Sequence, residues 1–350
     1  MRILYIGYPL LTVSEESAGG AEQILWALER EMHARGAYTM VAASSGSSVS
    51  GELFSTGQPC RETDDFDRRS REHQERVLQL IHAHECTAES FDLVHDMSGG
   101  FWPRAAEINA PVLATLHLPR LFYDQRLFRD VPLNVRFNCV SASQARSFAD
   151  LQAAETVVPN GILLERFAGN ANQPREGLFW LGRICPEKAP HIALDIAQRA
   201  RMPITLAGEV YPFSYHQQYF SDQVLPRLRQ MPDAIFISKP SPALKRRLLA
   251  EAQAMLITSQ AEETSSLVAM EAAASGTPVV AFRRGALPEI VKDGVTGFLA
   301  DSFEEAVLLL SRIGDIRSEE CRRHAARFSS DKMAQSYDSL YEQVMASVLV

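Results

Sequence analysis

Short apolar runs alternate with helical segments along almost the whole chain, and this pattern limits its fold more than any other feature. Runs at 3–7, 38–43 and 112–116 have the length and composition of buried strands, and apolar residues recur at helical spacing between them. Strands that are separated by helices pair in parallel and are covered on both faces. The sequence therefore predicts an α/β fold with parallel sheets.

Two series of this kind are expected, separated by the polar segment 166–176, which contains Gly and Pro. A chain of 350 residues is long enough for two domains. We expect an N-terminal Rossmann-like domain at 1–165 and a C-terminal one at 166–330, facing each other across a cleft. A final amphipathic helix is expected at about 331–349. Ligands of such sheets bind outside the carboxyl ends of the strands, so the cleft is the expected site.

The expected elements can be stated by residue number. In the first domain, strands are expected at 3–7, 38–43, 93–95, 112–116, 137–141 and near 157, with helices at 19–36 and from about 69 to 86. In the second domain, strands are expected at 178–181, 204–207, 234–237, 254–257, 279–282 and 297–299, with helices at 304–313 and 319–328. The segment 44–69 is expected to be a long loop.

Composition and charge narrow the possible function classes. The chain is 46% apolar and 22% charged, as in soluble globular proteins, and no apolar run reaches the roughly 18 residues of a membrane span. Its net charge of −8 disfavours broad binding to nucleic acids. The five cysteines are scattered and no C-x-x-C occurs, so neither a disulfide framework nor a zinc site is expected. A cytoplasmic location is the expectation.

The segment EETSSLVAMEAAASGTPVVAF carries the most informative functional pattern. Seven residues separate Glu263 from Glu271, and Gly276 and Pro278 end a helix that precedes a buried strand. Glu271 is then expected roughly 12 Å further along the helix axis than Glu263. Two carboxylates at that separation cannot share a metal, but they can hold the two ends of one long ligand.

Three polar residues, Thr264, Ser265 and Ser266, lie between these glutamates and are good N-cap residues. The free backbone N–H groups and the dipole of a helix at such a position favour a phosphate. A sugar, a diphosphate and a ribose laid end to end fit that order. Without its flanking residues, the same glutamate spacing is usual on a solvated helix face.

Other candidates follow expected strands. Gly19 and Gly20 open a helix and let a ligand approach the backbone, although a simple glycine turn explains them about as well. Arg183 and Lys188, in GRICPEK, can converge on a diphosphate, and the alternative is two surface cations near a turn. His117 ends a strand and can contact a sugar hydroxyl, although many histidines at strand ends are only packed there.

Two further groups are weaker candidates. His95 and Asp96 also end an expected strand. Asp64, Asp65 and Asp67 contain the Asp-x-Asp pattern that holds metal-bound nucleotide sugars in a different transferase fold, but no apolar strand precedes them here. We therefore expect these three aspartates to lie in a solvated loop.

Together these segments resemble glycosyltransferase family 4, whose members have the GT-B fold and transfer sugars from nucleotide donors with retention. LGRICPEKAP resembles the family's Gly-Arg…Glu-Lys-Gly loop, and residues 262–301 resemble its Glu-x7-Glu segment and the tail beyond it. GGAE, His117-Leu118-Pro119, VSASQA and VPNGI match more loosely. The closing helix resembles the one that crosses back onto the N-terminal domain in this family.

The resemblance implies a role for each candidate. Arg183 and Lys188 would hold the donor diphosphate. Glu271 would bind the ribose and Glu263 the transferred sugar, with His117 beside that sugar. The implied donor-binding residues are Gly19, Gly20, Arg183, Lys188, Glu263, Thr264, Ser265, Ser266, Leu267 and Glu271; the implied catalytic residues are His117, Glu263, Arg183 and Lys188. Neither a metal nor a cofactor is implied, because the nucleoside-diphosphate sugar is a co-substrate.

We therefore expect a retaining hexosyltransferase that moves a sugar to an acceptor hydroxyl on a small molecule, a glycan or a lipid-linked molecule. The alternatives are an epimerase or hydrolase of GT-B fold, and a nucleotide-sugar-binding protein without turnover. Two departures from the family pattern, Ser265-Ser266 in place of Phe-Gly and Ala189-Pro190 in place of Gly after the lysine, remove no charged group. Residues 120–136 are expected to be a helical packing segment, with an acceptor pocket or peripheral contact with a membrane as alternatives.

Overall fold

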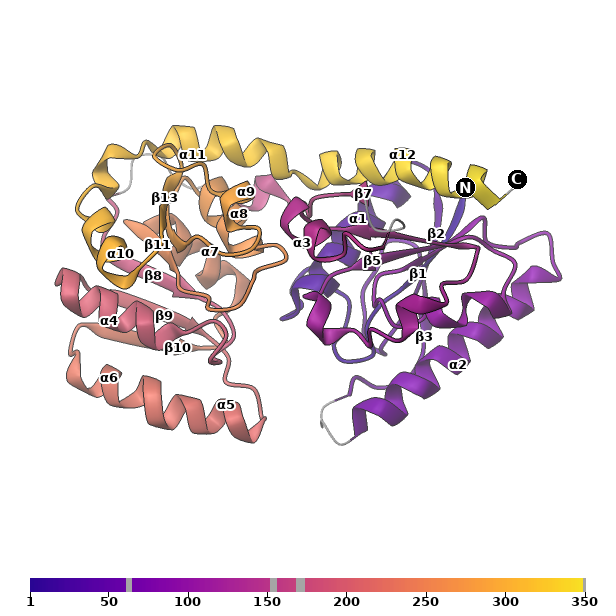
Figure 1. Cartoon of the computed structure of the whole chain (residues 1–350), viewed down its shortest axis with the longest axis horizontal. Helices are drawn as coiled ribbons and strands as arrows, with labels where there is room; N and C mark the ends of the chain where they lie inside the picture. The colour runs from indigo at the N-terminus through magenta and orange to yellow at the C-terminus, as the bar shows by residue number, and fades with distance from the viewer. Residues whose placement is uncertain (61–64, 152–155, 168–173, 349–350) are drawn as a thin grey trace. The chain divides into compact units, whose positions relative to one another are not determined.

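The structure is a computed structural model that describes the chain except for residues 61–64, 152–155, 168–173 and 349–350. The chain separates into two units, one formed by Met1–Gly161 and Ser330–Val350 and the other by Ile162–Ser329. More than half of the expected linker 166–176 lies outside the described residues. Each unit has one parallel sheet and the helices that cover it (Figure 1), which confirms the predicted fold of two Rossmann-like domains.

A seven-stranded sheet forms the first unit, and all neighbouring strands in it are parallel. In spatial order its strands are β3 (Glu52–Ser55), β2 (Tyr38–Ala43), β1 (Arg2–Ile6), β4 (Leu93–Asp96), β5 (Val112–Leu116), β6 (Val135–Cys139) and β7 (Thr156–Val157). Its α-helices are α1 (Gly20–Ala34), α2 (Phe66–Glu85), α3 (Ala142–Ser147) and α12 (Ser330–Val348). The direction of winding reverses between β1 and β4, which is the doubly wound arrangement of Rossmann-like sheets.

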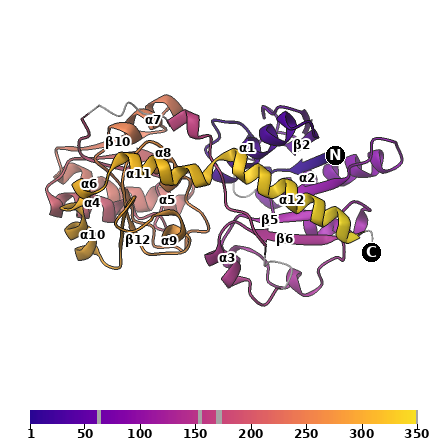
Figure 2. The ribbon, with the colours of Figure 1, turned by 90° about the horizontal axis from the view of Figure 1, so that it is seen from above.

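The closing helix α12 completes the core of the first unit and packs along α1 (Figures 1 and 2). Two of its side chains, Tyr337 and Tyr341, are fully buried. The Tyr341 hydroxyl lies 2.7 Å from Nδ1 of His95, and Asn138 donates to the Tyr337 hydroxyl at 3.1 Å. Buried polar groups need such partners, so this network fixes the helix on the sheet. The return of the last helix to the first unit agrees with the prediction.

The second unit has a six-stranded parallel sheet with the same kind of winding. In spatial order its strands are β10 (Ala234–Ser238), β9 (Ile204–Gly208), β8 (Leu178–Leu181), β11 (Ala254–Ile257), β12 (Val279–Phe282) and β13 (Gly297–Ala300). Its α-helices are α4 (Pro190–Ala200), α5 (Ser214–Tyr219), α6 (Leu225–Gln230), α7 (Pro242–Glu251), α8 (Leu267–Ala274), α9 (Leu287–Ile290), α10 (Phe303–Leu310) and α11 (Ser318–Ala325). The winding reverses between β8 and β11.

Helix α8 is buried around most of its circumference and is firmly anchored at its carboxyl end. Gly276 follows it with φ of +74°, the left-handed conformation that ends helices, as the sequence predicted. The carbonyl oxygen of Ser275 accepts hydrogen bonds from Arg175 at 2.8 Å and from Arg322 at 3.3 Å. These cations satisfy a carbonyl that the helix itself leaves without a partner.

Two predictions of secondary structure are wrong. The segment 44–69, expected to be a loop, contains the edge strand β3 and the start of α2. The segment 120–136, expected to be a helix, contains only the 3-10 turns Arg120–Phe122 and Leu127–Arg129 before β6 begins. Pro119 and Pro132 lack the N–H that a continuous helix needs, and Asp124 accepts the Arg126 N–H in a local turn.

Candidate functional site

The two loops with most of the predicted donor-binding residues follow β8 and β11, which are neighbours in the second sheet. The winding of the sheet reverses between these two strands, and ligands of doubly wound sheets bind at that reversal. The first loop, residues 182–189, leads from β8 into α4, and the second, residues 258–266, leads from β11 into α8. The topology therefore brings residues nearly 80 positions apart to one edge of the sheet.

Backbone contacts hold the first loop against the neighbouring strand β9. Gly182 N donates to Ala207 O at 3.1 Å, and Ile184 N donates to Glu209 O at 2.9 Å. A Cβ at Gly208 would lie 1.8 Å from the carbonyl oxygen of Gly182. Only glycine permits this approach, so the path of the loop depends on it.

The first loop ends in a strained residue. Ala189 has φ of 48° and ψ of 53°, the left-handed conformation, where the family that the chain resembles has glycine. An L-residue in this conformation costs about 1–2 kcal/mol. Thr258 Oγ1 donates to Ala189 O at 2.9 Å and accepts from Trp180 Nε1 at 3.1 Å, which fixes the strained peptide. Pro190 then begins α4, a position where its missing N–H costs no helical hydrogen bond.

Lys188 and Glu263 form an ion pair that joins the two loops. Lys188 Nζ lies 2.6 Å from Oε1 and 2.8 Å from Oε2 of Glu263, and the Glu263 side chain is only 9% exposed. Ser259 Oγ also donates to Oε1 of this carboxylate. A buried carboxylate requires such partners, so the pair fixes both side chains at the edge of the sheet.

The turn after β12 holds Glu263 from the other side. Ala286 N donates to Glu263 O at 2.7 Å, and Gly285 N donates to the Glu262 carboxylate at 2.6 Å. Gly285 has φ of +53°, and a Cβ there would lie 2.2 Å from Glu263 O. Glycine is needed at this position both for its conformation and for space.

Glu271, in the middle of α8, is paired with a different lysine. Lys245 Nζ, from α7, lies 2.8 Å from Glu271 Oε1, and the Glu271 side chain is only 5% exposed. Lys245 Nζ also lies 5.7 Å from the ring centroid of Phe167. The two predicted glutamates are therefore held by separate cations on separate elements.

The amino end of α8 lies between the two glutamates in the sequence, as predicted. Ser266 occupies the N-cap position, but its side chain makes no capping hydrogen bond, and Leu267 is the first helical residue. The Ser265 hydroxyl is buried and has no hydrogen-bond partner among the described residues. Thr264 precedes them in the same loop. Since the serine side chains do not cap the helix, they leave its first backbone N–H groups to other acceptors.

Arg183 differs from the other predicted cations. It forms no ion pair with any described residue, and its guanidinium carbon lies 5.6 Å from the ring centroid of Tyr211. A cation–π contact of this kind orients the guanidinium without neutralising it. Its charge is therefore available to an anionic ligand.

The first unit contains the remaining predicted residues. Gly19 is the N-cap of α1, and Gly20 is its first residue. A Cβ at Gly19 would lie 1.8 Å from the carboxylate of Glu22, so this glycine leaves the room that the buried carboxyl group occupies. Burial raises the pKa of Glu22 to about 7. Glu22 was not among the residues predicted from the sequence.

His117 lies directly after β5 and is 8% exposed. Burial lowers the pKa of His117 to about 4, so the imidazole is neutral at physiological pH. His95 is a satisfied core residue, since its ring nitrogens contact Tyr341 and Thr115 at 2.7 Å each. Asp96 accepts three backbone N–H groups in the turn that follows β4. These contacts support a structural role for His95 and Asp96.

Two of the three aspartates of the Asp-x-Asp candidate, Asp65 and Asp67, lie in the described part of the chain and have a structural role there. Asp65 lies at the N-cap position of α2, and both of its carboxylate oxygens accept hydrogen bonds from Arg68 at 2.6–2.7 Å. Asp67 lies in the first turn of the same helix. Asp64 lies outside the described residues. The two described aspartates are thus part of a helix start, not of a long loop.

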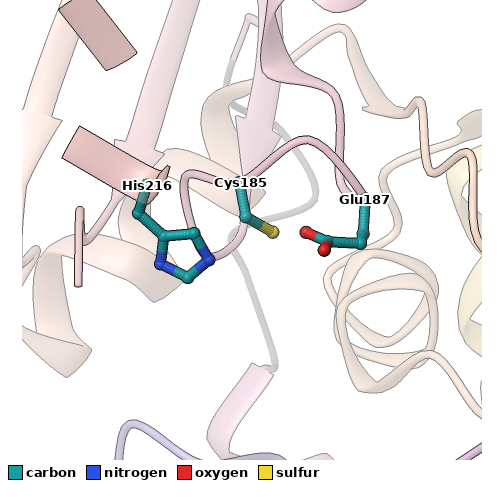
Figure 3. Close-up of side chains that lie close together, drawn as sticks. All are labelled: Cys185, Glu187 and His216. Atoms are coloured by element: carbon teal, nitrogen blue, oxygen red, sulfur yellow. The ribbon is translucent and has the colours of Figure 1, made fainter. Parts of the chain in front are cut away.

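One further group combines the first loop with α5. Cys185, Glu187 and His216 place a sulfur, a carboxylate oxygen and a ring nitrogen within 4.8 Å of one another. Figure 3 shows the sulfur pointing towards the Glu187 carboxylate, with the imidazole on its other side. No metal site was expected from the sequence, because His216 is 31 positions from Cys185 and lies on a helix that was not predicted.

Other residues of the site were also missed. Lys245 lies on a helix that was not predicted, and Ser259 lies in a loop without a distinctive motif. Gly285 lies within the segment 262–301 that carries the resemblance, but no role was assigned to it. A glycine that follows a buried strand is a weak signal for a close backbone approach. No comparable signal marks Lys245, because lysines on exposed helix faces are common.

None of the helices in the described part of the chain combines the length and apolarity that a bilayer crossing needs. All five cysteines are free thiols.

The second unit contains the part of the chain that matches a known family model. Residues 167–312 match the family model described as glycosyl transferases group 1. Over 232 residues, the chain is 29% identical to a D-inositol 3-phosphate glycosyltransferase of Geodermatophilus obscurus, an alignment that covers 57% of this chain and 51% of the relative. The chain spans about half the length of the curated relatives it matches.

Solved structures are similar over nearly the whole chain. AviGT4, a glycosyltransferase involved in avilamycin A biosynthesis, superimposes with a TM-score of 0.70 at 21% identity, covering 99% of this chain and 98% of that one. Alr3699/HepE of Anabaena, in complex with UDP and glucose, superimposes with a TM-score of 0.75 at 16% identity, covering 98% and 100%. These likenesses show the fold, which is GT-B, as predicted.

Proposed function

We propose that the chain is a retaining glycosyltransferase of family 4, from the geometry of the site and from the match of residues 167–312 to the glycosyl transferases group 1 model. It moves a hexosyl group from a nucleoside-diphosphate sugar to an acceptor hydroxyl. The acceptor is a small molecule, a glycan or a lipid-linked molecule, and the enzyme works in the cytoplasm. Nucleic acid is not a partner, in keeping with the net charge of −8.

One observation carries this proposal. The Lys188–Glu263 ion pair, at 2.6 Å, joins the two loops that flank the reversal of winding in the second sheet. This pair places a cation and a buried carboxylate at the position where doubly wound sheets bind nucleotides. A diphosphate and a hydroxyl-rich sugar need those two kinds of group side by side.

The cations of the first loop suit the leaving group. Arg183, which forms no ion pair with a described residue, presents a planar fork of donors that fits phosphate oxygens, and Lys188 adds a point charge. When the bond between the anomeric carbon and the diphosphate breaks, negative charge develops on the diphosphate. Fixed cations stabilise that charge more in the transition state than in the ground state.

The acidic residues suit the two ends of the donor. The Glu263 carboxylate accepts hydrogen bonds from sugar hydroxyls while Lys188 and Ser259 hold it in place. Glu271 accepts hydrogen bonds from the ribose hydroxyls, and Lys245 holds its carboxylate in place. The backbone N–H groups of Ser265, Ser266 and Leu267 contact the diphosphate or the sugar at the amino end of α8.

The proposed reaction needs no nucleophile from the protein. The anomeric carbon loses its bond to the diphosphate oxygen and forms one with the acceptor oxygen on the same face of the sugar. The proton of the acceptor hydroxyl passes to the departing diphosphate. In this mechanism the charges of Arg183 and Lys188 do the electrostatic work that a metal does in other transferases.

A donor screen tests the proposal. UDP-, GDP- and ADP-sugars are each added to the chain, and the cognate donor is expected to raise the melting temperature because it binds the folded state. Chromatography then follows the nucleoside diphosphate and the glycoside, with and without candidate acceptors. Equal amounts of the two products, with the donor's anomeric configuration kept in the glycoside, support transfer with retention.

The same assay separates the alternatives. Free sugar without any glycoside at every acceptor tried indicates a hydrolase, and an isomeric nucleotide sugar indicates an epimerase. A donor that binds but is never consumed indicates a binding protein. If Arg183→Ala turns over the donor as fast as the unmodified chain, the role assigned to Arg183 is wrong.

A further inference from the structure

The cluster of Cys185, Glu187 and His216 contains a buried histidine whose contacts are incomplete. His216 is 0% exposed, yet neither of its ring nitrogens has a hydrogen-bond partner among the described residues. Buried polar side-chain atoms are paired in the large majority of cases, and an exception calls for an explanation, of which a bound water or ion is one. The aromatic rings of Tyr211, Phe213 and Tyr215 lie beside the imidazole, with ring centroids 4.2–6.1 Å from it.

The other two members of the cluster also offer ligand atoms. Cys185 is buried and is a free thiol, and Oε2 of Glu187 is buried without a hydrogen-bond partner among the described residues. The sulfur, the carboxylate oxygen and the imidazole nitrogen lie within 4.8 Å of one another (Figure 3). Atoms bound to one zinc ion lie about 2.0–2.3 Å from it, so tetrahedral ligands are roughly 3.5 Å apart. Movements of about 1 Å bring these atoms to that separation.

The geometry points to a site for a borderline-soft divalent cation, zinc above all, bound by Cys185 Sγ, the Glu187 carboxylate and a ring nitrogen of His216. One thiolate, one carboxylate and one neutral imidazole form a ligand set that binds zinc in preference to magnesium or calcium. The thiol proton of Cys185 passes to solvent when the ion binds. Three protein ligands leave the fourth tetrahedral position for water or another small ligand.

The charges around the cluster permit this cation. The positive charge of Arg183 would repel a bound metal ion, since Arg183 interacts electrostatically with Cys185, Glu187 and His216. The thiolate and the carboxylate together bring two negative charges, which match the charge of the ion. Arg183 also lies over the ring of Tyr211, which holds its guanidinium by a separate contact.

A metal at this place would control the loop that carries the proposed donor cations. Cys185 and Glu187 lie between Arg183 and Lys188 in the sequence, and His216 belongs to α5. The ion would therefore tie residues 182–189 to α5 by bonds stronger than the present backbone contacts. The site has no part in the proposed transfer step, and its presence does not depend on which sugar the chain uses.

Cobalt titration of the full chain tests this site directly. The metal-free protein is titrated with Co²⁺, and the absorption of thiolate-to-cobalt charge transfer is recorded together with the visible bands of tetrahedral cobalt. We expect about one Co²⁺ per chain and displacement of these bands by Zn²⁺, which binds such sites more tightly. Bound Zn²⁺ should also slow amide hydrogen exchange in residues 182–189.

Variants assign the ligands. Cys185→Ser should abolish the charge-transfer band, and His216→Gln and Glu187→Gln should each weaken binding by at least the roughly 10–100-fold that loss of an outer-shell partner costs. Cys321→Ser removes an equally buried thiol elsewhere in the unit and should leave the band unchanged. Cys86→Ser removes an exposed thiol and should also leave the charge-transfer band unchanged.

Several results would overturn the proposal. These are the absence of a thiolate band in the unmodified chain, its persistence in Cys185→Ser, and an unchanged affinity in both His216→Gln and Glu187→Gln. If Cys185→Ser does not fold by circular dichroism, the other two variants decide the question. Because no sugar donor is present in these titrations, their failure is distinct from a failure of the proposed glycosyl transfer.

Discussion

Replacement of Lys188 by methionine leaves the Glu263 carboxylate without the cation that lies 2.6 Å from it. Glu263 is 9% exposed, so water cannot take over this interaction fully, whereas the Lys188 side chain is 34% exposed. Breaking a fully buried pair costs about 3–5 kcal/mol, and a charged hydrogen bond contributes about 1.5–3 kcal/mol. For this half-buried pair we expect a loss of about 2–3 kcal/mol in the free energy of unfolding of the second unit.

The assay is amide hydrogen exchange of peptides from β8 and β11, which reports the opening of the second unit alone. Lys239→Met is a matched control, because Lys239 lies 2.6 Å from Glu209 but is 69% exposed. Exposed pairs contribute about 0–1 kcal/mol, so this variant should be nearly neutral. In a double-mutant cycle with Glu263→Gln, we expect a coupling of about 1–3 kcal/mol. Equal losses in the two lysine variants, or a coupling near zero, would refute the reasoning.

Three further perturbations have defined outcomes. Gly285→Ala should destabilise the second unit by at least about 2 kcal/mol, measured by urea unfolding, because its Cβ would lie 2.2 Å from backbone atoms and φ is +53°. Gly294→Ala, with φ of +72° and open space, should cost only about 1 kcal/mol. Tyr341→Phe should cost the first unit about 1–3 kcal/mol, measured by hydrogen exchange, because Nδ1 of His95 loses its partner. In the unmodified chain, the free energy of unfolding should fall as the pH rises from 4.5 to about 7, because Glu22 loses its proton. Urea unfolding of Glu22→Gln should not show this fall.

The sign of the last effect follows from proton binding. Glu22 has a pKa of about 7 in the folded chain and 4.5 without burial, so the folded state binds more protons between these values. Its contribution to stability is therefore complete below pH 4.5 and is lost as the pH rises through 7, by up to about 3 kcal/mol. A glutamine variant with the same pH profile as the unmodified chain would contradict this account. Equal costs at the two glycines, or a neutral Tyr341→Phe, would contradict the other two predictions.

The alternation of apolar runs predicted the fold because each buried parallel strand must be apolar on both faces. The central strands β1, β5, β8, β11 and β12 were therefore visible in the sequence. The edge strand β3, with the sequence ELFS, is mostly exposed and lacks such an apolar run, so it was missed. The edge strand β10, in contrast, has the apolar sequence AIFIS and was predicted although it is only partly buried.

The residues of the candidate site that lie in one local motif were predicted from the sequence. Those that reach the site only through tertiary contacts were missed. The helix that contains Glu271 and ends at Gly276 followed from capping and turn residues over a short stretch. The partner of each glutamate, Lys188 for Glu263 and Lys245 for Glu271, depends on which elements meet in space. No local spacing contains that information.

Segment 120–136 shows how a wrong prediction arose. Its mixture of apolar and basic residues suggested one face of a packed helix, but Leu121, Phe122 and Leu133 are 77%, 63% and 95% exposed. The local turn around Asp124 interrupts any helix before an apolar face can form. Residue types alone did not distinguish this arrangement from a helix.

We expect a nucleoside-diphosphate sugar to bind in the second unit beside the amino end of α8. A crystal structure of the chain with its intact cognate donor tests this most directly. The diphosphate is expected at Arg183 and Lys188, the sugar on the Glu263 carboxylate and the ribose on Glu271. A donor bound elsewhere, or one that contacts neither glutamate, would contradict it.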